Sequence, residues 1–234
     1  MTSRGVTALE RLSRCVVGLE ATLDDSDWSR PSGCPGWSNH DVLIHLVCTL
    51  REIVVPESLP GPFAGGIERT NDLAVAAFRG ERPDQTLDTY RRLLAPALEA
   101  LVGMREEPAA SAPVDFDDAG SCPAHLIADS LAFDHYCHLR HDLAAPRGTV
   151  EALKVTADET VMAASLTWLL AGLPHGQRIT VEPNASPHAG ALITTSADSF
   201  HLWGTHRQPW RETDVDVRGD EKLAADVLDA LRVF

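Results

Sequence analysis

The chain has 234 residues, of which 44% are hydrophobic and 23% charged, and its formal net charge is -14. This length suits one large domain or two small ones, and either can bury a hydrophobic core. The acidic residues are spread along the chain, which argues against nucleic acid or a membrane surface as a partner because both favour basic patches. No apolar run is long enough to span a bilayer or resembles a signal peptide, so we expect a cytoplasmic protein.

Cysteine usage is uninformative, whereas histidine usage is not. The five cysteines are irregularly spaced and form no CxxC motif, which argues against a disulfide framework or an all-cysteine zinc site. Four of the ten histidines, in contrast, fall between His125 and His141.

The first part of the chain has the apolar spacing of long helices, predicted over 7–23, about 39–55, 67–79, 84–104 and 122–144. Ser38 and Asp41 form a capping box for the second of these helices. Ser121 is a suitable cap for the last one, and Pro123 suits its first turn.

The pattern changes after Pro146. One more helix is predicted at 156–171, followed by β-rich segments and a final helix from Asp220 through Leu231; the segments are RITVEP, GALITTS, SFHLWGTH and TDVDVRG. We therefore predict an α+β chain, with a four-helix bundle over residues 1–147 and a small α+β domain over residues 148–234.

The segment DHYCHLRHD, residues 134–142, carries the sharpest chemical signal. On an α-helix Asp134, His138 and His141 fall within roughly 60° of one another, on the same side as apolar residues. Buried charge and imidazole need partners, and a divalent cation would satisfy them together. A solvated polar stripe, or core histidines bonded to carbonyls, remains the alternative.

One helix supplies too few ligands, so a further ligand must come from elsewhere. His45 is the natural candidate, although it lies at the edge of the apolar stripe of its helix. Cys48 is an alternative soft ligand but is more typical of a small buried hydrophobe. For Cys34, packing in the turn is favoured over a role as nucleophile, and Trp28 and Trp37 are interpreted as a hydrophobic staple.

The segment PSGCPGWSNHDVLIHL, residues 31–46, resembles the opening signature of the mycothiol-dependent maleylpyruvate isomerase family, which has a DinB-like bundle. The family's second signature is an acidic residue, three residues, a histidine, two residues and usually an aspartate. Asp134 and His138 take the first two places. The place of the aspartate falls on His141, with Asp142 next to it, so a ligand, supporting or bystander role for His141 stays open.

The resemblance covers nearly the whole chain and implies that His45, Asp134 and His138 bind a divalent cation, zinc in the first place, with nickel or another ion as alternatives. It further implies that mycothiol occupies the open position as a thiolate. An isomerase would add this thiolate to a conjugated double bond, rotate the resulting single bond and eliminate the thiol. A thiol S-transferase would stop after the attack.

Such substrates are small molecules that carry carboxylates, so a cationic group is expected near the cation. The resemblance points to Arg207, near a strand end of the second domain, whereas Arg140 is interpreted as structural. Two other functions remain open: a metal-dependent hydrolase with Glu52 as base, and a non-enzymatic binding module stabilised by metal. The chain is expected to be a monomer or a homodimer.

Overall fold

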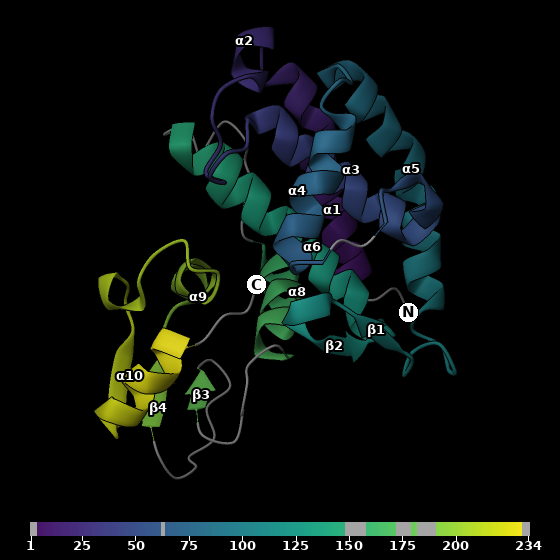
Figure 1. The fold of residues 1–234 in the computed structure, drawn as a ribbon. Helices are drawn as coiled ribbons and strands as arrows, with labels where there is room; N and C mark the ends of the chain where they lie inside the picture. Colours follow the sequence, from purple (N-terminus) through teal and green to yellow (C-terminus); the bar gives the residue numbers. More distant parts are fainter. Residues whose placement is uncertain (1–3, 62–63, 148–157, 172–178, 182–190, 231–234) are drawn as a thin grey trace. The chain divides into compact units, whose positions relative to one another are not determined.

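The computed structural model describes residues 4–61, 64–147, 158–171, 179–181 and 191–230 (Figure 1). The chain divides into two compact units, Met1–Ser165 and Leu166–Phe234. The first unit is a helical bundle and the second mixes helices with a small sheet, as the α+β prediction requires. The predicted boundary after residue 147 borders the stretch 148–157, which lies outside the described residues.

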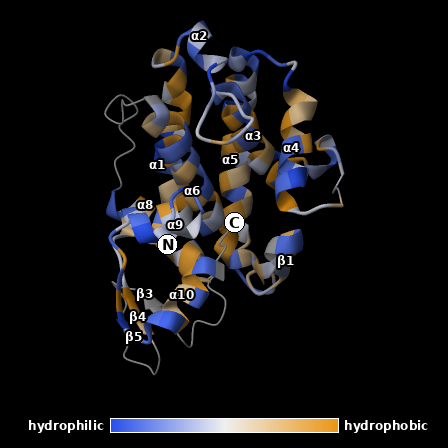
Figure 2. Cartoon of the chain, turned by 60° about the vertical axis from the view of Figure 1, so that its left-hand side comes forward, coloured by the Kyte–Doolittle hydropathy of each residue, from blue (hydrophilic) through white to orange (hydrophobic). Residues whose placement is uncertain are grey.

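The helices of the first unit carry both hydrophobic and hydrophilic residues (Figure 2). Its main helices are α1 (Arg4–Gly18), α3 (Asn39–Val54), α4 (Ile67–Phe78), α5 (Pro83–Gly103) and α6 (Ile127–Cys137). Helix α1 packs against α5 and α6, and α3 packs against α4 and α5. Short elements connect them: η1 (Leu19–Ala21), α2 (Asp25–Trp28), η2 (Pro56–Ser58), η3 (Asp117–Ala119) and η4 (Ala124–Leu126). None of the described helices is both long and apolar enough to cross a membrane.

The predicted capping box at the start of α3 is confirmed. The Ser38 hydroxyl accepts a hydrogen bond from the Asp41 backbone N–H at 3.1 Å, and Asp41 Oδ2 accepts one from the Ser38 N–H at 2.9 Å. The Arg79 guanidinium of the next helical hairpin donates to the other oxygen of Asp41 at 2.8 Å. These bonds fix the beginning of the helix that carries His45.

The predicted helix start near residue 122 is wrong. Residues Ser121–Pro123 form strand β2, which pairs antiparallel with β1 (Pro113–Asp115), and the α-helix begins only at Ile127. Pro123 has φ -65° and ψ 141°, which is an extended conformation. Because proline fixes only φ, and its φ value suits both a first helical turn and an extended strand, the sequence signal was ambiguous.

Helix α6 does not continue as an α-helix to its end. It passes into the π-helical segment η5 (His138–Ala144), in which the Ala145 N–H donates to the Arg140 carbonyl five residues earlier. The chain then closes with η6 (Ala145–Arg147). Such wide turns within α-helices are rare and frequent at functional sites.

In the second unit, strand β4 (Ala191–Thr194) lies between β3 (Ile179–Val181), to which it is parallel, and β5 (Asp216–Gly219), to which it is antiparallel. The helical elements are α8 (Glu159–Ala171), within which the two units divide, α9 (Ala197–Gly204), η7 (Trp210–Glu212) and α10 (Glu221–Ala230).

The β prediction for SFHLWGTH, residues 199–206, is wrong because most of this segment belongs to α9. The Ser196 hydroxyl caps the helix by accepting from the Ser199 N–H at 3.2 Å. Phe200, Trp203 and Gly204 are buried, and this spacing of three and four residues is helical.

Candidate metal centre

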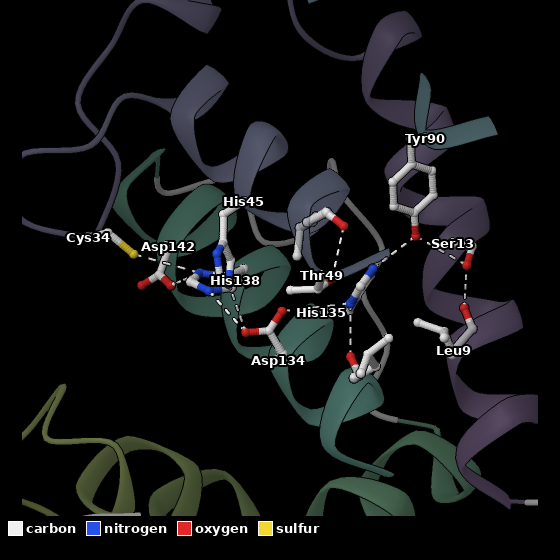
Figure 3. Close-up of polar contacts among 12 residues, drawn as sticks. Leu9, Ser13, Cys34, His45, Thr49, Tyr90, Asp134, His135, His138 and Asp142 are labelled. Atoms are coloured by element: carbon white, nitrogen blue, oxygen red, sulfur yellow. Dashed lines mark hydrogen bonds and ion pairs between the residues drawn. The ribbon is translucent and has the colours of Figure 1, made fainter. Parts of the chain in front are cut away.

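Two helices bring the three predicted ligands together (Figure 3). His45 comes from α3, Asp134 from α6, and His138 is the first residue of η5. Asp134 Oδ1 lies 3.2 Å from His45 Nε2 and 3.4 Å from His138 Nε2. The three ligand atoms all lie within 4.8 Å of one another, so the structure forms the cluster that a shared cation requires.

The distances at Asp134 match ligand spacing better than hydrogen bonding. Two ligand atoms on a tetrahedral zinc ion are about 3.3–3.4 Å apart, given metal–ligand bonds of about 2.0–2.1 Å. A charge-assisted N–H···O bond is about 2.7–2.9 Å long. The neighbouring pair of His138 Nδ1 and Asp142 Oδ2, at 2.7 Å, has that shorter length, whereas both contacts of Asp134 Oδ1 are longer.

Charge and burial reinforce the cluster. Only 5% of His45 and 8% of His138 is exposed. Burial alone would raise the pKa of the Asp134 carboxyl, but the positive charges of His45 and His138 outweigh burial and hold it well below its ordinary value. Burial would likewise lower the pKa of His138, but the Asp134 carboxylate raises it well above its usual range. The centre therefore keeps an ionised carboxylate between two imidazoles.

The donor set fits a divalent cation. His45 Nδ1 and Asp134 Oδ2 are buried without a hydrogen-bond partner, so this polar cluster is not satisfied by protein groups alone. Buried polar groups need a compensating interaction. A cation at the three converging atoms would place its charge beside these side chains and would be bound by their other polar atoms. Two imidazole nitrogens and one carboxylate oxygen suit zinc, and they do not discriminate sharply against nickel or other divalent ions.

Trp37 covers one side of the two imidazoles. Its ring centroid lies 5.2 Å from that of His45 and 6.2 Å from that of His138, with the latter ring nearly parallel. The indole N–H donates to Asp72 Oδ1 of α4 at 2.8 Å. Sequence reasoning interpreted Trp37 only as a staple; in the structure its ring also lies beside the two imidazoles of the cluster.

The Nδ1 side of His138 faces two further groups. Asp142 Oδ2 lies at 2.7 Å and Cys34 Sγ at 3.7 Å, and these three side chains form a second cluster of groups that could bind metal. No histidine stands at a telling spacing from Cys34 in the sequence, because His138 follows it 104 residues later.

Two residues whose roles were left open, His141 and Cys48, lie outside both clusters among the described residues. The His141 ring meets Tyr136 edge-on, with ring centroids 5.8 Å apart. Cys48 is buried, and burial raises the pKa of its thiol to about 12. A thiol with that pKa is a small hydrophobe rather than a ready thiolate ligand.

His135 is a buried structural residue that sequence reasoning did not single out. Its Nδ1–H donates to the Leu131 carbonyl at 2.9 Å, and its Nε2 lies 3.0 Å from the Tyr90 hydroxyl. Burial lowers the pKa of His135 to about 4, so the ring is neutral and Nε2 accepts from Tyr90. In the sequence, the apolar residues around position 135 indicate only that His135 is buried, and they do not identify Tyr90 as its partner.

Two further predicted residues lie outside the cluster. Arg207 belongs to the second unit and follows α9. Its backbone N–H donates to the carbonyl of Leu202 in that helix at 2.9 Å, and its functional role stays a prediction. Glu52 lies on α3 and keeps contact with solvent. Neighbouring protein groups nevertheless desolvate its carboxyl, which raises the pKa to about 7, and the negative charge of Asp134 adds to this shift.

Comparisons with known proteins identify the family and the fold. A family model described as the mycothiol maleylpyruvate isomerase N-terminal domain matches residues 9–144. A crystal structure of the mycothiol-dependent maleylpyruvate isomerase superposes with a TM-score of 0.57 at 14% identity, covering 93% of this chain and 92% of that one. A histidine-to-alanine mutant of that enzyme gives a TM-score of 0.55 at 14% identity, over 92% and 93% of the two chains. The search of curated proteins found no match.

Proposed function

The chain belongs to the mycothiol maleylpyruvate isomerase N-terminal domain family, and from this premise we propose that it is a divalent-metal-dependent enzyme that uses a low-molecular-weight thiol. The thiol is mycothiol, and the reaction is the isomerisation of, or transfer to, a small electrophile. The observation that carries the proposal is the single carboxylate oxygen of Asp134, which lies at ligand spacing from two imidazoles on different elements.

His45, Asp134 and His138 would hold the cation, in the first place zinc. Three protein ligands leave an open position on a tetrahedral ion, where a bound thiol has a lowered pKa and is kept as thiolate. The Trp37 ring lies beside the same two imidazoles, and an apolar ring there would keep water from the bound groups and strengthen their interactions.

In the isomerisation, the thiolate sulfur forms a bond to one carbon of a conjugated double bond, and the electron pair of that bond moves to the conjugated carbonyl as an enolate. The former double bond is now single and rotates. Expulsion of the thiolate then restores the double bond in the trans geometry. A transferase would protonate the adduct after the attack.

We further propose that Arg207 binds a carboxylate of the substrate. A guanidinium recognises a carboxylate by two parallel hydrogen bonds and keeps its charge at all relevant pH values.

The test is a calorimetric titration of mycothiol into zinc-loaded protein and into protein stripped by a chelator. We expect binding only to the loaded form, together with thiol-dependent cis–trans conversion of an unsaturated keto acid such as maleylpyruvate. If metal-replete protein neither binds mycothiol nor needs a thiol for turnover, the proposal is wrong.

A metal-dependent hydrolase is the second candidate, and one observation favours it. A pKa of about 7 would suit Glu52 for general-base catalysis at neutral pH. Hydrolysis of an ester or amide panel without any thiol, with loss of that activity in Glu52→Gln, would support this alternative.

A further inference from the structure

His138 makes a different polar contact with each of its two ring nitrogens. Nε2 faces the shared oxygen of Asp134 at 3.4 Å, and Nδ1 faces Asp142 Oδ2 at 2.7 Å. An ionised carboxylate can only accept, so the hydrogen of this short bond sits on Nδ1. In a neutral imidazole that arrangement leaves the lone pair on Nε2, the atom that belongs to the metal cluster.

Asp142 lies four residues after His138, within the π-helical segment. Residues four apart are neighbours on a helix surface, and the wider turn keeps Asp142 beside His138 while it moves the third residue further round the helix. The third residue, His141, turns away and packs its ring against Tyr136. The resemblance predicts an aspartate at position 141, three residues after His138. In this chain the aspartate stands one residue later, at position 142, and the π-helical turn still leaves it beside His138.

The loop before α3 holds Asp142 from the other side. The Gly33 N–H donates to the Asp142 carbonyl at 2.8 Å, and only 2% of Asp142 is exposed. A Cβ atom on residue 33 would lie 2.8 Å from Asp142 Cα and 2.9 Å from its Oδ1, so only glycine fits there. The loop itself is closed by a bond from the Ser32 N–H to the Trp37 carbonyl at 2.9 Å.

We infer that Asp142 is a positioning residue that fixes the orientation and tautomer of His138, and that the π-helical turn and Gly33 place it there. The inference rests on the proposed function, because it assumes that His138 Nε2 is a metal ligand. Carboxylates that accept the free N–H of a ligating histidine hold the ring in place and increase its basicity, and their loss weakens metal affinity about 10–100-fold.

The competing interpretation is a second cation bound by Cys34, His138 and Asp142. It would require His138 Nδ1 to carry no hydrogen and to stand at ligand spacing from the carboxylate, about 3.3 Å. The observed 2.7 Å is instead the length of a charge-assisted hydrogen bond. The geometry therefore assigns Asp142 to the support of His138 rather than to a second ion.

The test compares Asp142→Ala and Asp142→Asn with the unaltered protein, using zinc affinity measured by chelator competition and the visible spectrum of the cobalt-substituted protein. We expect Asp142→Ala to bind zinc about 10–100-fold more weakly and to change the cobalt spectrum. Asp142→Asn should recover most of the affinity, because its amide oxygen still accepts from Nδ1–H. A purely structural role would lower stability without this rescue or spectral change.

Two controls and three outcomes make the test decisive. Asp129→Ala removes another carboxylate of α6, and His141→Ala removes the neighbouring imidazole; both should keep the affinity and the spectrum.

If the unaltered protein binds no cation, the proposed function fails first. If it binds zinc and Asp142→Ala binds zinc equally well, or His141→Ala is the variant that loses it, the inference about Asp142 is overturned while the proposed function stands. A second equivalent of cobalt bound with a thiolate charge-transfer band that disappears in Cys34→Ser would also overturn it.

Discussion

Gly33 and Asp142 are in direct backbone contact, although they lie 109 positions apart in the sequence: the N–H of one donates to the carbonyl of the other at 2.8 Å. This contact links the loop before α3 to the wide turn that follows His138. A side chain at position 33 would collide with the Asp142 backbone, which cannot move as a flexible side-chain end can.

We therefore expect Gly33→Ala to lower the free energy of unfolding by about 1–3 kcal/mol, as overpacking does, and to weaken zinc binding. Thermal unfolding with and without zinc measures both effects. Gly18→Ala is the matched control, since a Cβ there meets no atom within 4 Å. Equal stability and zinc affinity of Gly33→Ala and the unaltered protein would show that the loop does not restrain Asp142.

Loss of His45 should abolish the centre. We expect His45→Ala to bind zinc at least about 100-fold more weakly, and to lose the stabilisation that zinc gives, because metal binding is coupled to folding. Elemental analysis and unfolding after chelation are the measurements. His40→Ala is the control, because it removes an imidazole of the same helix that bonds to Thr86 rather than to the cluster. Unchanged metal content in His45→Ala would contradict the assignment.

The bond between Tyr90 and His135 should contribute to stability but not to metal binding. In Tyr90→Phe the buried Nε2 of His135 loses its donor, which we expect to cost about 1–3 kcal/mol in the free energy of unfolding. Zinc affinity should stay within about threefold. Thr22→Val, which removes an exposed hydroxyl, gives the reference for a harmless loss. A large fall in zinc affinity of Tyr90→Phe would mean that the network positions Asp134.

The pH dependence of stability should contain a contribution from Asp129. Burial raises the pKa of this carboxyl to about 6, against the opposing charges of Arg105 and Arg4. Its ionisation therefore disfavours the folded state, and stability should fall as the pH rises from about 4 to about 6. Asp129→Asn should remove this fall. Because the carboxyl is partly exposed and solvent screens its charge, the variant should be more stable at pH 7 by about 1–2 kcal/mol, which is less than the full pKa shift would give; urea unfolding measures this.

Asp158 should contribute to the pH dependence of stability with the opposite sign, and it serves as the comparison. Burial would raise its pKa, but hydrogen bonds from the start of α8 and the Arg11 guanidinium lower it below the ordinary value. Its contribution to stability is present at neutral pH and is lost as the pH falls through the lowered pKa. Asp158→Asn should therefore destabilise the protein at pH 7. The same sign for both variants would refute this account.

Arg207 is tested by steady-state kinetics. If it binds the substrate carboxylate, Arg207→Ala should raise KM about tenfold or more, and Arg207→Lys should recover part of the loss, because lysine keeps the charge but not the paired hydrogen bonds. Arg218→Ala, which breaks only an exposed ion pair with Asp216, is the control. Equal KM values for Arg207→Ala and Arg218→Ala would remove Arg207 from the site.

The sequence singled out the residues of the cluster because each carried a local signal. The capping box at Ser38 fixed the helix of His45, and the spacing of Asp134 and His138 placed them on one helical face. The pairing of these two elements came from the resemblance, since helix periodicity contains no information about which helices meet.

The environment of the centre was not predictable in the same way. The residue pattern contains no signal for the π-helical turn after His138, so ideal α-helix geometry wrongly placed His141 on the face of Asp134 and His138. The contacts of Cys34 and Trp37 with the imidazoles depend on the fold of a loop that the sequence marks only as rich in proline and glycine. The strand at Ser121–Pro123 and helix α9 were missed because their sequence signals suit both a helix and a strand.

The position of Trp37 also makes its fluorescence a probe of the ion that is bound at the centre. One of the five indoles lies within 5.2 Å of a ligand ring, measured between centroids, so its emission senses what occupies the centre. Cobalt or nickel, with partly filled d shells, should quench that fluorescence, whereas zinc, with a closed shell, should not. The choice among these ions can then be followed by light alone, without any substrate.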